Sequence, residues 1–105
     1  MPELNAGQTY TAIAPITNPT DWSFNYTAEL YLGLPKAASS GIKTFTLGPG
    51  VSQNISFPVT MPADEGVFPV YLDILVDGEL VAGFVAEPVT TVIVPAVEIG
   101  PIIWE

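Results

Sequence analysis

Prolines and glycines interrupt this chain throughout its length. Eleven prolines and nine glycines are spread over 105 residues, and no segment carries apolar residues at the i, i+3, i+4 and i+7 spacing of an amphipathic helix over three turns. Proline inside a helix removes a backbone hydrogen bond and clashes with the preceding turn. Runs of β-branched and aromatic residues lie instead between turn-forming clusters such as "TNPTD" and "LGPGV". The sequence therefore predicts an all-β fold.

The turn clusters divide the chain into seven strand segments and an extended tail. We predict strands over 9–17, 23–34, 42–47, 52–60, 67–76, 79–86 and 89–94. Short strands at this regular spacing are typical of an antiparallel β-sandwich of seven to eight strands. Pro15, Pro58 and Pro69 fall inside predicted strands, so we expect them at sheet edges or β-bulges, because proline cannot donate to the ladder.

One domain and an apolar tail account for the whole chain. A chain of this length holds a single core, and we assign residues 1–95 to it and residues 96–105 to a C-terminal strand. Ile99, Ile102, Ile103 and Trp104 make that segment more apolar than a free terminus usually is. We expect it to dock, either on its own domain or on a neighbouring subunit.

The stretch "YLDILVDGELVAGFV", residues 71–85, predicts a β-hairpin. Asp77-Gly78 between two apolar runs is the signature of a two-residue type I′ turn. Such a turn pairs Val76 with Glu79, and counting outward then gives the pairs Leu75–Leu80, Ile74–Val81, Asp73–Ala82 and Tyr71–Phe84. One face then carries Val70, Leu72, Ile74, Val81 and Val85, and the other carries Tyr71, Leu75, Leu80, Ala82 and Phe84 around Asp73.

Both faces of this predicted hairpin are apolar, although a half-buried hairpin should be apolar on one face only. Burying a Leu or Phe side chain contributes about 1.5–3 kcal/mol, so a second apolar face left in water forgoes a large stabilisation. The sequence leaves three explanations open: a different register with the face covered by loops of the same domain, a ligand groove, or a protein interface. We predict the interface, formed by Tyr71, Leu75, Leu80 and Phe84 with the tail residues.

The charge balance excludes several classes of partner. Eleven acidic residues stand against Lys36 and Lys43, which gives a net charge of −9 in a chain that is 49% hydrophobic. Such a chain is repelled by nucleic acid and by anionic membranes. No apolar run is long enough to cross a bilayer, and "MPELNAGQTY" lacks the basic and apolar regions of a secretion signal. We expect no signal peptide in this chain, no membrane insertion and no nucleic-acid partner.

Catalytic chemistry has few residues to draw on. The chain has no cysteine and no histidine, which removes thiol catalysis, disulfides and the usual general base. The acidic residues of the turns, such as Asp64, Asp77 and Glu79, lack the spacing of a calcium loop, although looser calcium ligation by loop carboxylates stays open. We expect no catalytic residue, no cofactor, no metal site and no enzymatic activity.

A set of turn and strand motifs over residues 6–86 resembles a known class of module. Gly7-Gln8-Thr9 and Thr17-Asn18 flank one strand, Leu47-Gly50-Ser52 precedes another, and Gly66-Phe68-Val70 leads into the hairpin. This order of turn and strand motifs resembles that of the immunoglobulin-like modules of the bacterial and archaeal cell-adhesion-related class, which occur on cell surfaces and, as related folds, on virus particles. In that class a first strand precedes the Gly-Gln pair. Here "MPELNA" is too short and too polar for it, whereas residues 97–104 look like the missing strand.

The predicted function follows from these surfaces. We expect a non-enzymatic structural or interaction module, a small subunit or decorating protein of a virion or extracellular assembly, with partners that are copies of itself or a capsid or cell-surface protein. The alternative is an adhesin-type or carbohydrate-binding module of a larger surface protein, with aromatic residues stacking on sugars. Trp22, Tyr26 and Tyr31 are the candidates for that stacking.

Overall fold

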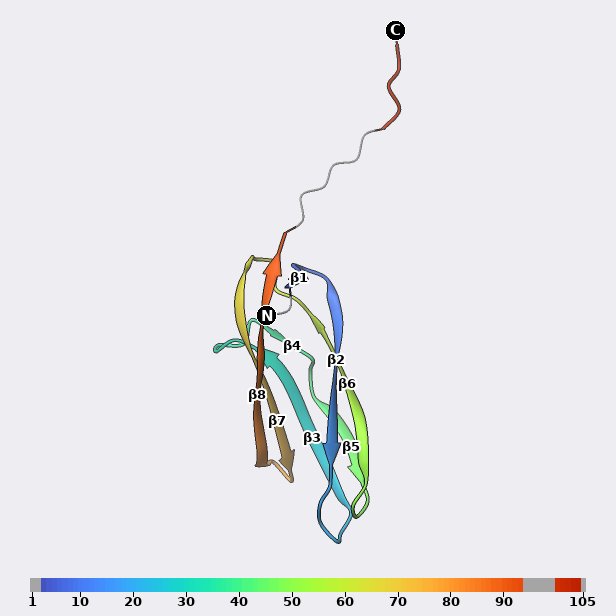
Figure 1. The fold of residues 1–105 in the computed structure, drawn as a ribbon, viewed down its shortest axis with the longest axis vertical. Helices are drawn as coiled ribbons and strands as arrows, with labels where there is room; N and C mark the ends of the chain where they lie inside the picture. Colours follow the sequence, from blue (N-terminus) through green and yellow to red (C-terminus); the bar gives the residue numbers. More distant parts are fainter. Residues whose placement is uncertain (1–2, 94–99, 105) are drawn as a thin grey trace.

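The computed structural model describes residues 3–93 and 100–104, and these residues form an all-β fold of two sheets (Figure 1). The larger sheet has the order β1-β8-β7-β3-β4, with β5 also paired to β3, and the smaller sheet consists of β2 and β6. The strands in this described part are β1 (Glu3–Asn5), β2 (Thr9–Thr17), β3 (Phe24–Leu32), β4 (Ala38–Ser39), β5 (Lys43–Leu47), β6 (Ser52–Thr60), β7 (Gly66–Val76) and β8 (Glu79–Val92).

The prediction of an all-β fold is confirmed, and most strand limits agree. The predicted segments 9–17 and 52–60 coincide with β2 and β6, while three others differ by one or two residues at their ends. Segments 79–86 and 89–94 are wrong as separate strands, because β8 continues through them. Glu87 and Pro88 lie opposite Pro69 in a bulge, since the ladder pairs Val70 with Ala86 and then Phe68 with Val89. A bulge accommodates proline without ending the strand.

The N-terminal residues also form a strand, which corrects the expectation that they are too short and too polar to do so. Glu3–Asn5 pair in parallel with Thr90–Val92 at the end of β8, so the larger sheet is mixed rather than antiparallel. Leu4 packs against the core. β1 pairs with β8 and not with β2, so it does not cover the edge of β2 that faces away from β6.

The core lies between the two sheets and draws on both. The larger sheet contributes Leu32 from β3 and Leu72 from β7, and the smaller sheet contributes Phe57 and Val59 from β6. Phe57 is fully buried. The prolines fit this arrangement as predicted: Pro15 and Pro58 lie in the smaller sheet, whose strands each have one partner among the described residues, and Pro69 lies at a bulge.

The register of the β7–β8 hairpin differs from the sequence prediction beyond its first two pairs. Val76–Glu79 and Leu75–Leu80 pair as expected, but a bulge follows, and Ile74 then lies opposite Ala82 rather than Val81. The pairs Asp73–Ala82 and Tyr71–Phe84 are therefore wrong: Asp73 lies opposite Gly83, Leu72 opposite Phe84 and Tyr71 opposite Val85. One extra residue in a strand moves the following side chains to the other face.

Asn18, in the loop that follows β2, joins this loop to the end of β5. Its side-chain amide donates to the backbone carbonyls of Trp22 (2.6 Å), Leu47 (3.0 Å) and Gly48 (3.1 Å). Its side-chain oxygen accepts from the backbone and hydroxyl of Thr20. The side chain is fully buried. The Trp22 carbonyl also accepts from the Thr20 hydroxyl and the Gly48 carbonyl from the Val51 N–H, so the Leu47 carbonyl is the one whose bond to Asn18 is fully buried.

We expect Asn18→Ala to lower the free energy of unfolding by about 1–3 kcal/mol, because the Leu47 carbonyl loses its buried amide donor and a buried polar group left without a partner costs about that much. Asn18→Asp keeps the shape but removes the donor, so a similar loss is expected. Urea denaturation of the three proteins measures this. Retention of full stability by either variant would show that the loop does not depend on the amide.

Candidate interaction surface

The inner face of the larger sheet, which we define as the face toward β2 and β6, is only partly covered. Leu72 on β7 lies in the core with 7% of its surface exposed, whereas Phe84, opposite it on β8, is 63% exposed. Residues opposite each other in an antiparallel pair share a face, so Phe84 belongs to the inner face. The smaller sheet therefore ends before it reaches β8, and one side of the two-layered fold is open.

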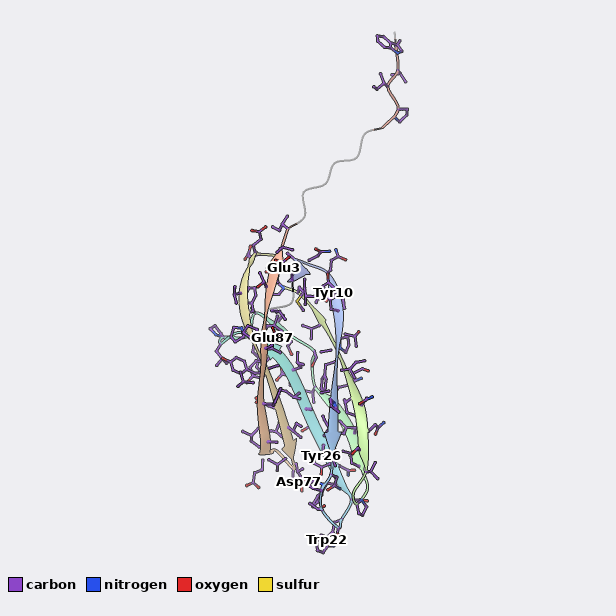
Figure 2. The ribbon with its side chains drawn as sticks, in the orientation of Figure 1. Glu3, Tyr10, Trp22, Tyr26, Asp77 and Glu87 are labelled. Atoms are coloured by element: carbon purple, nitrogen blue, oxygen red, sulfur yellow. The ribbon has the colours of Figure 1, made fainter. Side chains whose placement is uncertain are left out.

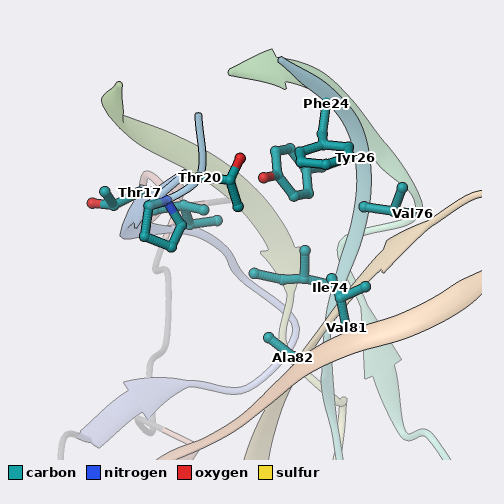
Figure 3. Close-up of a pocket in the computed structure, with 10 residues that line it drawn as sticks. Thr17, Thr20, Phe24, Tyr26, Ile74, Val76, Val81 and Ala82 are labelled. Atoms are coloured by element: carbon teal, nitrogen blue, oxygen red, sulfur yellow. The ribbon is translucent and has the colours of Figure 1, made fainter. Parts of the chain in front are cut away.

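A pocket of about 500 Å³, which we call the cleft, lies on this open side (Figure 3). The C-terminal part of β2 and the loop after it form one wall, and the hairpin of β7 and β8 forms the other. The lining residues are Ile16, Thr17, Pro19, Thr20, Phe24, Tyr26, Ile74, Val76, Val81 and Ala82. All of them are uncharged, in a chain of net charge −9. The cleft is therefore an uncharged and mainly apolar pocket, formed by β2 with the loop after it, by the start of β3 and by the β7–β8 hairpin.

A second hollow of about 230 Å³ continues along the inner side of β2 toward its N-terminal end. Tyr10 and Ala12 of β2 line it, together with Leu4 of β1 and Val89 of β8. Both hollows are thus bordered by the same strand. The inner side of β2 borders a hollow near each of its ends, although Ile16 itself is buried.

Two strand edges border this open side. β2 pairs with β6 on one edge, and no strand of the described chain pairs with its other edge. β8 pairs with β1 only over Thr90–Val92, so its outer edge has no partner strand between Glu79 and Ala86 in residues 3–93 and 100–104. Backbone donors and acceptors on such edges are available to an added strand.

The predicted interface residues divide between the two faces of the larger sheet. Tyr71, Leu75 and Leu80 lie on the outer face, where Tyr71 and Leu75 are half-buried and Leu80 is exposed. Phe84 lies on the inner face, contrary to the sequence prediction, because of the bulge. Val85 takes its place beside Tyr71. The structure therefore does not bring the four residues together as one patch.

The outer face carries a polar network rather than a continuous apolar patch. The Tyr31 ring stacks on Tyr71 at 5.4 Å between centroids, and its hydroxyl donates to Asp73 at 2.9 Å. That hydrogen bond to the carboxylate, aided by desolvation, raises the pKa of Tyr31. Lys36 lies over the Tyr31 ring and donates to Glu29 at 2.6 Å. Hydrogen bonds from Lys36 and then Ser39 lower the pKa of Glu29.

The described part of the tail makes no contact with either sheet. Residues 100–104 lie beyond the C-terminal end of β8 (red in Figure 1), and Ile102, Ile103 and Trp104 are 78%, 77% and 92% exposed. Ile99 lies outside the described residues. Docking of the tail on a neighbouring subunit stays a prediction, and its own domain does not cover these three side chains here.

The aromatic residues considered for sugar stacking are placed differently from one another. Tyr26 is buried against Phe45 with ring centroids 5.6 Å apart, and Tyr31 is buried between Tyr71 and Lys36. Trp22 is exposed at the end of the molecule where β2 ends and β3 begins (Figure 2). Only Trp22 of these three offers a free ring face.

Sequence reasoning missed the residues that form the cleft. Ile16 and Thr20 line the same pocket as Val81 and Ala82 because the two sheets pack as they do and because β8 is bulged. No local sequence pattern signals this bulge. The position of Phe84 on the inner face is a consequence of the bulge. Within residues 3–93 and 100–104, no group of three or more acidic residues is arranged to hold a metal ion. No helix in this part of the chain is long and apolar enough to cross a membrane.

Because Phe84 is exposed and Phe57 is buried, we predict that replacing them by alanine lowers the free energy of unfolding by different amounts. Phe57→Ala should lower the free energy of unfolding by about 3–5 kcal/mol, as for a buried aromatic side chain. Phe84→Ala should cost less than about 1 kcal/mol, because exposed substitutions have small effects. Urea denaturation at low protein concentration measures both. Equal losses would mean that Phe84 is covered within its own chain.

The lowered pKa of Glu29 predicts a pH-dependent contribution to stability. A carboxyl group with a lowered folded-state pKa stabilises the fold above its unfolded pKa and loses that contribution as the pH falls through the folded value. The stability difference between the wild type and Glu29→Gln should therefore be present at neutral pH and vanish in acid. It should be modest, since Lys36 is half exposed. Denaturation curves of Glu29→Gln with and without Lys36→Met isolate the pair, and a difference independent of pH would contradict this.

Comparison with known proteins adds no relative from which a function might be transferred: no protein-family model matches the chain, and no curated protein is similar to it in sequence.

Proposed function

We propose that this chain is a non-enzymatic structural subunit that associates with copies of itself through the open side of its two-layered fold. The observation that carries the proposal is Phe84, an inner-face residue that remains 63% exposed. Its partner across the ladder, Leu72, is buried in the core. Together with the exposed Val81 and the adjoining cleft, Phe84 forms an uncovered apolar region, and such contiguous regions mark contact sites.

The strand order supports an immunoglobulin-like arrangement, which we include in the proposal. In that fold one sheet has the order A-B-E-D and the other contains C, F and G. Here β2 and β6 correspond to B and E, and β3, β7 and β8 correspond to C, F and G. The position of strand A, beside β2, has no strand in the described chain. The open side of the fold is therefore the place where this architecture normally has another strand.

Electrostatics favours the same region for contact between copies. Two chains of net charge −9 repel each other over most of their surfaces. The cleft is lined by uncharged side chains, and next to it Val81 and Phe84 are exposed. Covering such side chains contributes about 1.5–3 kcal/mol for each one fully buried. Contact at this side gains apolar burial with little added charge repulsion.

We place this subunit in a virion or cell-surface assembly, on the resemblance of residues 6–86 to modules of such surfaces. The alternative of a carbohydrate-binding module has weaker support. Tyr26 and Tyr31 are occupied by packing, which leaves Trp22 as the exposed aromatic ring of the three. A single exposed ring is a common surface feature and favours no ligand.

The test is the absolute mass of the full chain in solution, measured by light scattering over a range of concentrations. One chain has a mass of 11.1 kDa, and we expect masses of several chains that rise with concentration. Phe84→Asp should lower the mass toward that of one chain. Val85→Asp adds the same charge one residue away on the outer face and should leave the mass unchanged. A wild type of 11.1 kDa at every concentration would overturn the proposal.

A further inference from the structure

We propose that the cleft beside β2 binds the apolar C-terminal segment of a second copy of this chain, which supplies the strand that the smaller sheet lacks. The part of this segment that the structure describes is residues 100–104, with the sequence Gly-Pro-Ile-Ile-Trp. This proposal rests on the proposed function and adds to it the occupant of the cleft. The added strand would pair through its backbone with β2 and place alternate side chains against the inner face.

The length of the segment suits the edge of β2. Residues 97–104 would span about 26 Å as a strand, and the nine residues of β2 span about 30 Å. Pro101 lacks an N–H group, which an edge strand with one neighbour tolerates. The donor and the edge that it would pair with are therefore matched in length.

The side chains of the segment suit the lining of the cleft. Successive residues of a strand point to opposite faces, so Ile102 and Trp104 share one face and Ile103 lies on the other. Ile102 and Trp104 would enter the cleft, whose walls include Ile16 and Val81. A pocket of about 500 Å³ lies in the range that accommodates ligands with several large groups.

Charge supports a contact between two copies at this place. Ile102 and Trp104, the residues that would enter the cleft, are uncharged, as are the lining residues of the cleft, while Glu98 and Glu105 lie on either side of them in the sequence. Two strongly acidic chains can thus join here without placing a carboxylate in the cleft itself. Apolar side chains that are exposed in both partners become covered by the same contact.

The geometry favours another copy over the segment's own domain. β1 occupies the edge of β8 at the point where the chain leaves the sheet, with Glu3–Asn5 paired to Thr90–Val92 and the Ala6 N–H donating to the Val92 carbonyl at 2.8 Å. The cleft lies at the opposite end, where β2 and β7 end and β8 begins (Figures 1 and 3). Residues 100–104 extend away from that end (Figure 1). The segment is therefore positioned to reach a neighbour placed end to end.

The experiment uses two full-length variants that each lack one half of the contact. Ile102→Asp places a carboxylate on the donor segment and leaves the cleft intact, while Val81→Asp does the reverse. Each variant alone should remain a monomer by light scattering. A mixture of the two retains one intact donor and one intact cleft, and should form a complex of two chains that grows no further.

Matched controls and the wild type separate this proposal from the proposed function. Ile42 is 67% exposed in the loop before β5, close to the 78% of Ile102, so Ile42→Asp should leave assembly unchanged. Circular dichroism checks that each variant is folded, and Ala82→Asp replaces Val81→Asp if the latter is not. If both variants are monomeric and their mixture also stays monomeric, the proposal that one copy supplies a strand to another is overturned.

Two further outcomes would also overturn it. Continued assembly of Ile102→Asp would show that copies associate without the segment, which leaves the proposed function standing. A monomeric wild type that Ile102→Asp destabilises would show that the segment fills its own cleft, and would overturn both proposals.

Discussion

The limited width of the smaller sheet determines the rest of this structure. In the described chain β2 and β6 must cover the inner face of a sheet that also contains β7 and β8, and two strands about 4.8 Å apart cannot do so. The core is well packed beneath β6, where Phe57 is fully buried, and becomes progressively open toward Phe84. The cleft, the two available edges and the exposed aromatic side chain all follow from this mismatch between the layers.

The fold was largely predictable because its strands are marked by local chemistry. Turn residues and β-branched runs identified β2 and β6 to the residue. The short strand β1 was missed, since three residues of mixed polarity form a strand only when a neighbouring edge is available. The end of the predicted strand at Ala86 was wrong for a related reason: Pro88 usually interrupts a ladder, but the extra residue of a bulge removes the need for its N–H group.

The candidate site was less predictable, because it depends on register and on contacts between distant segments. The sequence prediction counted residue pairs outward from the Asp77-Gly78 turn and assumed that side chains alternate between the faces of β8 without a bulge. This placed Phe84 opposite Tyr71. The bulge reverses that assignment over Ala82 to Ala86. Neither segment contains a signal that Ile16 and Val81 line the same pocket. The apolar character of Ile102 and Trp104, by contrast, is visible in the sequence and agrees with their exposure in the structure.

Because β8 contains two bulges, the number of residues in this strand determines which of its side chains lie on the inner face and which on the outer face. Each adds one residue relative to β7, so the side chains between them have the reverse orientation, and those after the second bulge return to the original one. Loss of a single codon in this interval would exchange the inner and outer side chains of several consecutive residues at once. In natural variation of this chain, a one-residue insertion or deletion in β8 should therefore be rarer than almost any substitution there. Paired length changes at both bulges would be the tolerated exception.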